Sequence, residues 1–360
     1  MNARFLGVLL LLLVMLGGGA LLVRRQAETQ RPADAAALGQ PLLKDLKASE
    51  VAAISIREPK GALTIQRKGE RWLIAERDGF PADFDRVREF VVKALGLKIG
   101  QSDAIGDKDR ARLNLDASGT AIEFLGADGK PLARLVAGRK YFKNEPDNPT
   151  KAIGDGRFVM LPGEDKRLFV VSDPLTQASI RTADWISRAG FAAEKVRTLE
   201  VRLADGGAWK IERSGDNADW KLAGASRGEK LEVTKANAAS YSLAKVELAD
   251  VAPKTLKPED AGLDKPATVV ATTFDGLTYT LSVGKMEGDN YFAALAIAGE
   301  AKPEGKDAEE RMKALGERLP REKALAGHTL LIAKSKLDDV LRKRAELLEK
   351  KEEKKQPGRR

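Results

Sequence analysis

The sequence predicts an α+β fold of two related units, each an antiparallel sheet with one main helix, behind one N-terminal transmembrane helix. Short runs such as Val51–Ile56 and Val196–Val201 alternate hydrophobic and other residues, which is typical of strands with one buried face. The same series of landmarks also occurs twice along the chain. We therefore interpret the body of the chain as a tandem duplication of a β-meander, a helix and a β-hairpin.

The spacing between the two copies is nearly constant. Four pairs of landmarks define it: Ile56 and Val201, 145 residues apart; Trp72 and Trp220, 148 apart; Asp116 and Asp264, 148 apart; and Gly138 and Gly284, 146 apart. Four pairs of landmarks whose spacings differ by no more than three residues indicate a repeated structural unit.

Each copy presents its elements in one order. After the strands that surround the tryptophan, apolar residues follow helical spacing, over Phe84–Leu97 in the first copy and Ala236–Leu248 in the second. Two strands joined by Asp-Gly come next, which favours a hairpin. The expected hairpin pairs are Ala121–Leu125 with Leu132–Val136 and Val269–Thr273 with Tyr279–Val283, and the expected closing strands are Leu168–Val171 and His328–Ala333.

Composition divides the chain into five regions. We expect a membrane anchor over 1–25, a linker over 26–47, a first unit over 48–185, a second unit over 190–345 and a charged tail over 346–360. The second unit carries a charged insert, 300–327, whose polar composition favours a mobile loop with a short helix at Ala308–Leu315.

The stretch Phe5–Val23 holds no charged residue and is long enough, at roughly 28 Å as a helix, to cross a bilayer. A cleaved signal peptide is the alternative, with the small residues Gly18 and Ala20 before the cleavage site. Leu21–Val23 continue the apolar run beyond that site, which favours an uncleaved anchor. Arginines lie on both sides of the stretch, so the residues alone leave the orientation open.

The positive charge lies at the two ends of the chain. Residues 1–31 sum to +3 and residues 334–360 to +5, out of a net +9. A nucleic-acid-binding body would carry its basic excess on the folded domain, so nucleic acid is not an expected partner. In the tail, Leu337, Val340, Leu341, Leu347 and Leu348 recur at helical spacing, and they either dock on the second unit or lie on a membrane surface.

Residue counts exclude several chemistries. The chain has no cysteine and one histidine, His328, so disulfide scaffolds, thiol nucleophiles and most zinc sites are excluded. Ser242 and Lys245 match a Ser-x-x-Lys pattern, but the accompanying elements of that enzyme class are missing, so a helix surface is the expected role. For His328 we expect a surface or strand-edge position.

Two acidic clusters resemble loose calcium ligands, but neither has the spacing of a calcium loop, so solvated acids are expected there. Their residues are Asp103, Asp107 and Asp109, and Glu145, Asp147, Asn148 and Asp155. Trp72, Trp209 and Trp220 could stack on a sugar, yet the apolar neighbours of Trp72 and Trp220 favour buried anchors of the core. The sequence therefore predicts no catalytic, cofactor-binding or metal-ligating residues.

Several short motifs carry a family resemblance: the strand–Gly–Trp opening, the entry to a helix at Phe80–Asp83, the step Gly262–Asp264 and the turn Val283–Lys285. With these motifs the chain resembles the domain-of-unknown-function 4340 family over roughly residues 48–345. The resemblance implies a membrane-anchored bacterial protein with its domain outside the inner membrane. It also implies a link to auxiliary components of gliding-motility-type ABC transporters, and it supplies no catalytic residues. The charged insert and the basic tail depart from the family pattern.

These observations together favour a non-catalytic, membrane-anchored accessory or scaffolding protein of the bacterial envelope. We expect a single-pass inner-membrane protein with a periplasmic domain, bound to the membrane through residues 5–23 and to envelope or ABC transporter proteins, without a cofactor. An alternative is a ligand-binding envelope module that holds a glycan or peptide in a groove between the two units, which exposed Trp or Tyr side chains would favour. A hydrolase that uses carboxylates alone is a third class, but no pair of acids with a suitable environment stands out.

Overall fold

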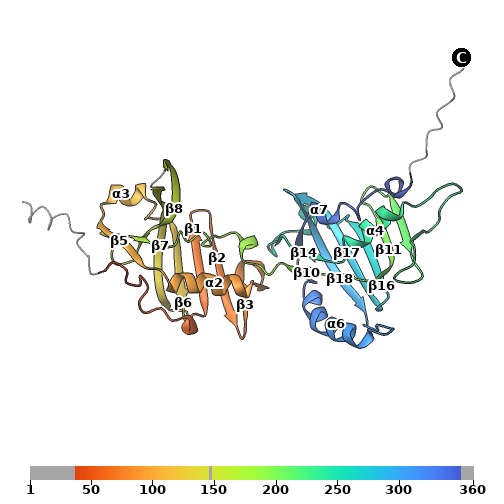
Figure 1. Ribbon diagram of the computed structural model, residues 1–360, viewed down its shortest axis with the longest axis horizontal. Coiled ribbons are helices and arrows are strands. Elements are labelled where there is room, and N and C mark those ends of the chain that lie inside the picture. Colours follow the sequence, from red (N-terminus) through yellow and green to blue (C-terminus); the bar gives the residue numbers. More distant parts are fainter. Residues whose placement is uncertain (1–36, 146–147, 350–360) are drawn as a thin grey trace, which may run out of the picture. The chain divides into compact units, whose positions relative to one another are not determined.

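The computed structural model describes residues 37–145 and 148–349 and has an α+β fold with two large antiparallel sheets (Figure 1). The chain divides into two compact units. The first comprises the described residues up to Trp72 together with Phe84–Arg181, and the second comprises Leu73–Asp83 together with the described residues from Thr182 onward. The α+β class predicted from the sequence is confirmed.

The first sheet has nine strands in the order β4-β3-β2-β1-β6-β7-β8-β9-β5, all antiparallel to their neighbours. Two α-helices, α2 (Phe84–Leu95) and α3 (Asp107–Arg112), accompany it, with the 3₁₀ turns Ala48–Glu50 and Ala75–Arg77. The strands are β1 (Ala53–Glu58), β2 (Gly61–Lys68), β3 (Arg71–Ile74), β4 (Phe80–Pro81), β5 (Ile99–Ala104), β6 (Thr120–Leu125), β7 (Pro131–Glu145), β8 (Asn148–Met160) and β9 (Arg167–Val171).

Alternation along the strands places one set of side chains in the first core. Ile54 and Ile56 of β1 are fully buried, and Ile56 pairs with Leu63 of β2 in the antiparallel register. Helix α2 turns a face of Val87, Phe90, Val91 and Ala94 to the interior, and the ring of Phe90 stacks on that of Phe124 from β6, 5.9 Å between centroids. The helix predicted over Phe84–Leu97 is therefore confirmed, and Figure 1 shows it across one face of the sheet.

The second sheet repeats the strand order of the first from β3 onward. Its order is β13-β12-β11-β16-β17-β18-β19-β15, so β11 lies beside β16 as β1 lies beside β6. Its strands are β11 (Val196–Arg202), β12 (Ala208–Glu212), β13 (Lys221–Leu222), β15 (Asp250–Val251), β16 (Ala267–Thr273), β17 (Leu277–Glu287), β18 (Asn290–Gly299) and β19 (Leu330–Ala333). The other elements of this unit are β10 (Ala189–Phe191) paired with β14 (Val246–Glu247), the helices α4 (Val233–Tyr241), α5 (Pro258–Ala261), α6 (Ala308–Lys323) and α7 (Lys334–Leu337), and the 3₁₀ turns Thr182–Asp184 and Arg344–Leu347.

Both hairpins predicted from the Asp-Gly turns are confirmed. Strand β6 pairs with β7, and β16 pairs with β17. Gly129 and Gly276 have φ angles of 76° and 83°, in the left-handed region that a tight turn needs and that glycine enters without steric cost.

The segment Leu73–Asp83 belongs to the second unit, although the sequence places it between the strands and the helix of the first. The amide of Asp83 donates to the carbonyl oxygen of Trp185 at 2.7 Å, and the amide of Ser187 donates to Pro81 at 3.0 Å. Phe80 is buried, with the ring of His328 edge-on at 5.1 Å. The predicted boundary at 185–190 follows the order of the repeat and does not anticipate this exchange.

The region predicted to be a linker is in part folded. Leu42, Leu43 and Leu46 are buried in the first unit, and the amide of Leu42 donates to the carbonyl oxygen of Leu97 at 2.8 Å. Three leucines within five residues bury enough apolar surface to order this stretch. Folded structure thus begins before residue 48.

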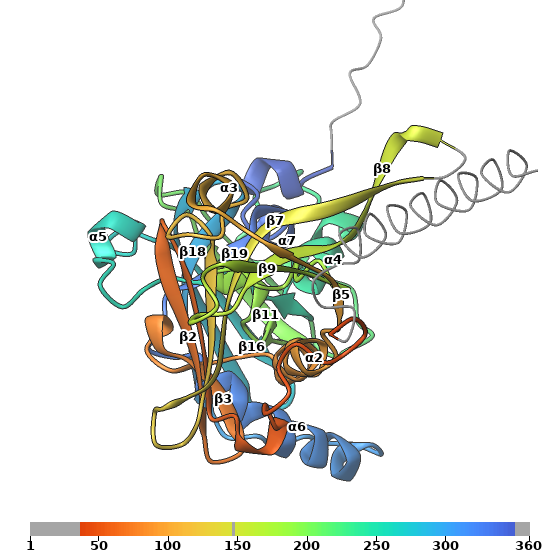
Figure 2. The ribbon, with the colours of Figure 1, turned by 90° about the vertical axis from the view of Figure 1, so that its left-hand side faces the viewer.

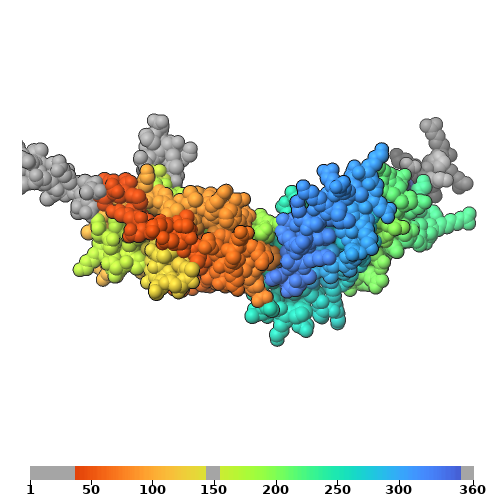
Figure 3. Space-filling view, turned by 90° about the horizontal axis from the view of Figure 1, so that it is seen from below, coloured from red at the N-terminus to blue at the C-terminus, as the bar shows by residue number. Residues whose placement is uncertain are grey.

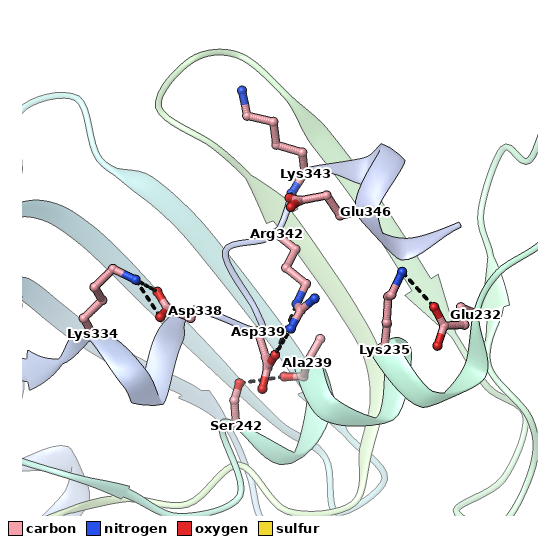
Figure 4. Close-up of polar contacts among 10 residues, drawn as sticks. All are labelled: Glu232, Lys235, Ala239, Ser242, Lys334, Asp338, Asp339, Arg342, Lys343 and Glu346. Atoms are coloured by element: carbon pink, nitrogen blue, oxygen red, sulfur yellow. Dashed lines mark hydrogen bonds and ion pairs between the residues drawn. The ribbon is translucent and has the colours of Figure 1, made fainter. Parts of the chain in front are cut away.

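The C-terminal segment docks on the second unit, but without a long helix. Leu337, Val340 and Leu347 are fully buried, and the indole of Trp209 donates to the carbonyl oxygen of Arg342 at 2.7 Å. Figure 4 shows this segment beside α4, with Arg342 paired to Asp339. The docking alternative is confirmed, and the unit extends past the predicted limit of 345. Helix α4 is also shorter than predicted, because Val246–Leu248 passes through the strand β14.

The predicted membrane span Phe5–Val23 lies outside the described residues. Among residues 37–145 and 148–349, no helix is long and apolar enough to cross a membrane.

Candidate functional site

The serine and lysine of the Ser-x-x-Lys pattern do not form a catalytic pair. The hydroxyl of Ser242 donates to the carbonyl oxygen of Ala239 at 2.8 Å, one turn back on α4 (Figure 4). The ammonium of Lys245 lies on the surface, 3.4 Å from a carboxylate oxygen of Glu247. This is the helix-surface role that the sequence analysis favours, because the helix backbone already holds the hydroxyl.

His328 lies at the start of the closing strand region, partly buried against Phe80. Burial lowers the pKa of its imidazole, and the positive charge of Lys254 lowers it further, while the negative charge of Asp78 raises it. Asp78 and Lys254 form an exposed ion pair at 2.9 Å beside it. The histidine is a packing residue in contact with an aromatic ring, and in the part of the chain that the structure describes no group of three His, Cys, Asp or Glu residues could hold a metal ion.

Each acid of the first predicted cluster pairs with, or accepts a hydrogen bond from, a nearby side chain. Asp107 pairs with Arg110 at 2.6 Å, Asp109 pairs with Arg112 at 3.1 Å, and Asp103 accepts a hydrogen bond from Gln101 at 2.5 Å. These are exposed pairs along α3 and β5, as solvated acids form. In the second cluster, Asp147 lies outside the described residues.

The three tryptophans that sequence analysis considered are buried, as predicted for core anchors. Trp220 donates from its indole to Asn237 at 3.1 Å, and the guanidinium of Arg213 lies over its ring at 4.7 Å from the centroid. Since the indole groups of Trp209 and Trp220 both have internal hydrogen-bond acceptors, they are anchored in the second unit rather than turned to solvent.

Side chains of the charged insert take part in a polar cluster of the second unit. Its helix α6 covers Ala308–Lys323 and buries Leu315, Leu319 and Glu322, which lie four and three residues apart on one face. The prediction of a mobile loop with a helix ending at Leu315 is wrong in length and in order. Gly316 and Pro320 weaken helices, yet α6 continues through both, and the amide of Ala324 still donates to the carbonyl oxygen of Pro320.

Glu322 is the centre of this cluster, with 1% of its surface exposed. Its carboxylate accepts hydrogen bonds from the Tyr279 hydroxyl and from the Ala192 amide, each at 3.0 Å, and lies 2.9 Å from Nε of Arg318. Burial raises the pKa of Glu322, against the opposing effect of Arg318 and the two hydrogen bonds. Burial, with the added charge of Glu322, also raises the pKa of Tyr279.

Arg318, one turn before Glu322 on α6, completes the cluster. Its Nη1 lies 2.8 Å from a carboxylate oxygen of Glu194, and its Nη2 donates to the carbonyl oxygen of Ala192 at 3.0 Å. Nη1 and Nη2 of the guanidinium thus contact the loop before β11, while Nε forms an ion pair with Glu322 without a hydrogen bond of good geometry. The cluster ties α6 to the loop before β11 and to the sheet, and a buried acid satisfied in this way acts as a structural lock.

A pocket of about 430 Å³ opens beside α6, and we call it the α6 pocket. Its lining comes from α6, the end of α4, the loop before β11 and the turn after β12. Its lining includes the charged or aromatic residues Lys195, Arg213, Tyr241, Asp275, Arg311 and Arg318. Figure 3 shows the segment that contains α6, in blue, on the outer surface of the second unit.

Sequence reasoning missed this site because Glu322 and Arg318 look like ordinary members of a charged run. Their spacing of four residues was a readable signal, since it brings both onto one helix face. That the face turns inward follows only from the tertiary packing of Leu315 and Leu319.

A second feature lies in the first unit, where β7 and β8 continue beyond their neighbours. Strand β6 pairs with β7 only as far as Ala137, and β9 pairs with β8 only from Arg157. Beyond these points no described strand but its partner pairs with either β7 or β8, out to Glu145 and Asn148, although the amide of Arg139 still donates to the carbonyl oxygen of Leu113 at 2.8 Å; Figure 2 shows this two-stranded ribbon. In the second unit β19 pairs as far as Asn290, beside the hairpin tip, so the corresponding hairpin has a third strand.

Near its base the ribbon carries one packed and one exposed aromatic ring. Tyr141 lies edge-on to Phe158, 5.6 Å between centroids, against the cluster around Leu115. Phe142, the next residue, is 54% exposed. A large exposed aromatic side chain on a ribbon with open edges is typical of protein-binding surfaces.

Comparison with known proteins gives one match. The model of the family described as "Domain of unknown function (DUF4340)" matches residues 72–266, which run from strand β3 of the first sheet to the residue before β16 of the second. No curated protein and no solved structure matches the chain.

Proposed function

The chain belongs to the DUF4340 family, and on that premise we propose that it is a non-catalytic accessory or scaffolding protein of the bacterial envelope. The observation that carries the proposal is the two-stranded ribbon of β7 and β8 in the first unit. In this proposal the ribbon docks on a partner protein, and the membrane anchor 5–23 holds the chain beside it.

The ribbon has the geometry of a docking element. Past Ala137 and Arg157, no other strand of the described residues pairs with either edge. Open strand edges offer backbone donors and acceptors to an added strand, and natural proteins normally cover or shorten such edges unless they are used. The exposed ring of Phe142 supplies an apolar anchor for the same contact.

The state of the reactive side chains supports a non-catalytic role. The Ser242 hydroxyl donates to its own helix, and the imidazole of His328 packs on Phe80. The buried acid of the α6 cluster, Glu322, has hydrogen-bond donors on both oxygens. These three groups are thus committed to the fold. The burial of Trp209 and Trp220 also weakens the alternative of a glycan module, which needs aromatic rings on a surface.

Membrane attachment, a periplasmic location and the kind of partner rest on the sequence. The uncharged stretch 5–23 supports a single-pass anchor, and the family resemblance supports an external domain beside an ABC-type transport system. The shared strand order of the two sheets supports an origin by tandem duplication. In this arrangement the two copies differ in this hairpin, which has a third strand along its tip only in the second unit.

Site-specific photo-crosslinking in intact cells tests the proposal. A photoreactive phenylalanine analogue replaces Phe142 in the full-length protein, and the adducts are identified by mass spectrometry. Met286 is the matched control, because it lies near the tip of the corresponding hairpin and is 43% exposed. We expect an adduct with an envelope membrane protein from position 142 and none from position 286.

Adducts that are identical at the two positions, or none at position 142, would contradict the docking role of the ribbon. The nature of the captured protein tests the finer statement. A subunit of an ABC-type transporter supports it, whereas an unrelated cytoplasmic protein argues against the envelope location.

A further inference from the structure

Two hollows of the second unit meet at Arg213. One is the α6 pocket, and the other is a groove of about 490 Å³ on the outer face of the sheet, lined in part by Arg197, Arg213 and Lys221. We call this second hollow the sheet groove. Arg213 lines both hollows, and we call the two together the recess.

The recess has a basic excess. Its lining contains six cationic side chains against four anionic ones. The cations are Lys195, Arg197, Arg213, Lys221, Arg311 and Arg318, and the anions are Glu194, Glu212, Asp216 and Asp275. A ligand that carries negative charge is therefore favoured in this recess.

Arg311 and Lys195 differ in how their charges are partnered. Nη2 of Arg311 lies 2.8 Å from Asp275 and donates to the carbonyl oxygen of Glu304, while its Nε and Oδ1 of Asp275 are both buried without a hydrogen bond. Within the described chain no carboxylate pairs with Lys195, whose backbone is fixed by a hydrogen bond from the Phe274 amide to its carbonyl oxygen at 2.9 Å. The ammonium of Lys195 is therefore available to a carboxylate of a ligand.

The other arginines shape the recess. Arg213 donates to the carbonyl oxygen of Val196 at 2.7 Å and pairs with Asp216 at 2.8 Å, while its guanidinium lies over the Trp220 ring. Arg318 is held by Glu194 and Glu322, as described above. These two guanidinium groups are therefore fixed by contacts within the second unit.

Apolar surface accompanies the charge. Leu315 and three alanines line the α6 pocket, and Tyr241, which is 72% exposed, stands at its rim. A small inorganic anion uses none of this surface. A peptide uses both kinds, since its carboxylates pair with guanidinium groups and its side chains pack on the tyrosine.

We propose that this recess binds an extended acidic peptide segment of a partner protein. The chain's own C-terminus is not the occupant, because residues 350–360 carry six Lys or Arg against two Glu and share the sign of the recess. The proposal is independent of the ribbon in the first unit, so it adds a second partner contact to the proposed function.

Fluorescence anisotropy on the full-length protein in detergent tests the inference. The probe is a fluorescein-labelled decapeptide that alternates Glu and Asp with Ala, Phe and Leu, and the control probe replaces each acid by its amide. We expect the acidic peptide to bind at low salt, and its affinity to fall at least tenfold in 0.5 M NaCl, as screened charge pairs do. The amide peptide should bind at least tenfold more weakly.

Charge-neutralising variants locate the site. Arg311→Gln and Lys195→Gln should each weaken binding of the acidic peptide about tenfold, since each removes a charged donor. Arg202→Gln removes the same charge from an exposed arginine of β11 that lines neither hollow, and it should change affinity less than twofold. Thermal unfolding of each variant confirms that the second unit remains folded.

Three results would overturn the inference. One is equal binding of the acidic and the amide peptide. Another is an equal loss of affinity in Arg202→Gln and Lys195→Gln, which would mean non-specific attraction. The third is tighter binding of an oligonucleotide of the same charge through the same side chains, which would assign the recess to nucleic acid. If Arg311→Gln fails to fold, Lys195→Gln alone decides the location.

Discussion

Gly284 lies so close to Ala261 that a Cβ atom on the glycine would be 2.1 Å from the alanine's carbonyl oxygen. Gly138 of the first unit has the same relationship to Leu113, at 2.3 Å. Both glycines occupy the strand after the hairpin turn, beneath the short helical step that carries the Leu-Asp landmark. The sequence repeat at these two positions therefore has a physical cause, because only glycine lets the backbone of that step approach the strand.

Replacing either glycine by alanine should destabilise its unit by about 1–3 kcal/mol, as overpacking does. Gly316→Ala is the matched control, since a Cβ there meets no atom within 4 Å and the position lies inside α6. Helix propensity predicts that this control gains up to about 1 kcal/mol. Urea unfolding of the full chain measures all three, and a Gly284→Ala variant as stable as the wild type would contradict the close approach.

Truncation of Trp72 or Trp220 to alanine should cost about 3–5 kcal/mol each, as expected for buried aromatic side chains. For Trp220 the loss includes the hydrogen bond to Asn237 and the stacking of Arg213. Phe84→Ala is the control, because that ring is 57% exposed, and it should change stability by less than about 1 kcal/mol. Equal effects at all three positions in chemical unfolding would mean that the tryptophans are not core anchors.

Local patterns in the sequence predict local structure well here. The Asp-Gly turns and the period-two alternation locate both hairpins, and the tryptophans are recognisable as core residues. Two inferences fail where they depend on distant parts of the chain: the unit boundary and the order of the charged insert. The segment Leu73–Asp83 has the pattern of a first-unit meander, yet it is held by hydrogen bonds to Trp185 and Ser187 of the second.

The candidate site shows the same limit. The polar composition of the insert 300–327 predicts a loop, since composition alone cannot show that Leu315 and Leu319 pack against the rest of the unit. The burial of Glu322 follows from that packing and from the donors that Tyr279 and Ala192 supply. The β7–β8 ribbon is not predicted for a related reason. Whether another strand pairs beside β7 and β8 depends on segments that are distant in the sequence.

The docked C-terminal segment gives a prediction about truncation. A chain that ends after Lys336 loses Leu337, Val340 and Leu347, all fully buried, and should lose roughly 5 kcal/mol or more of unfolding free energy. A chain that ends after Glu349 loses only the residues beyond the described range and should keep its stability. Thermal unfolding and limited proteolysis compare the two. Equal stability of both truncations would show that the segment contributes nothing to the core.

The single histidine allows a direct titration. Because burial disfavours the imidazolium, ¹³C-histidine NMR of the full chain should give a pKa for His328 below 6.5. Asp78→Asn should lower this pKa further, since the carboxylate of Asp78 stabilises the charged form. A folded-state pKa below the unfolded value means that stability decreases as pH falls below about 6.5. A value at or above 6.5 would contradict the partly buried position against Phe80.

The buried carboxyl of Glu322 predicts a pH dependence of the opposite sign. Its folded-state pKa is raised above the ordinary 4.5, so between these two values the folded state binds more protons than the unfolded one. The free energy of unfolding therefore falls as pH rises from about 4.5 through the raised pKa. Glu322→Gln cannot titrate, so the difference in stability between wild type and this variant should shift with pH in favour of the variant across that window.

Urea unfolding of the full chain at intervals from pH 4 to pH 8 measures this difference. Glu317→Gln, an exposed position on the same helix, controls for the change in net charge and should follow the wild type at every pH. If Glu322 is buried with Arg318 and Tyr279, the slope of unfolding free energy against pH should differ between the wild type and Glu322→Gln. Parallel slopes for all three proteins would mean that Glu322 reaches solvent and that α6 is not held by a buried acid.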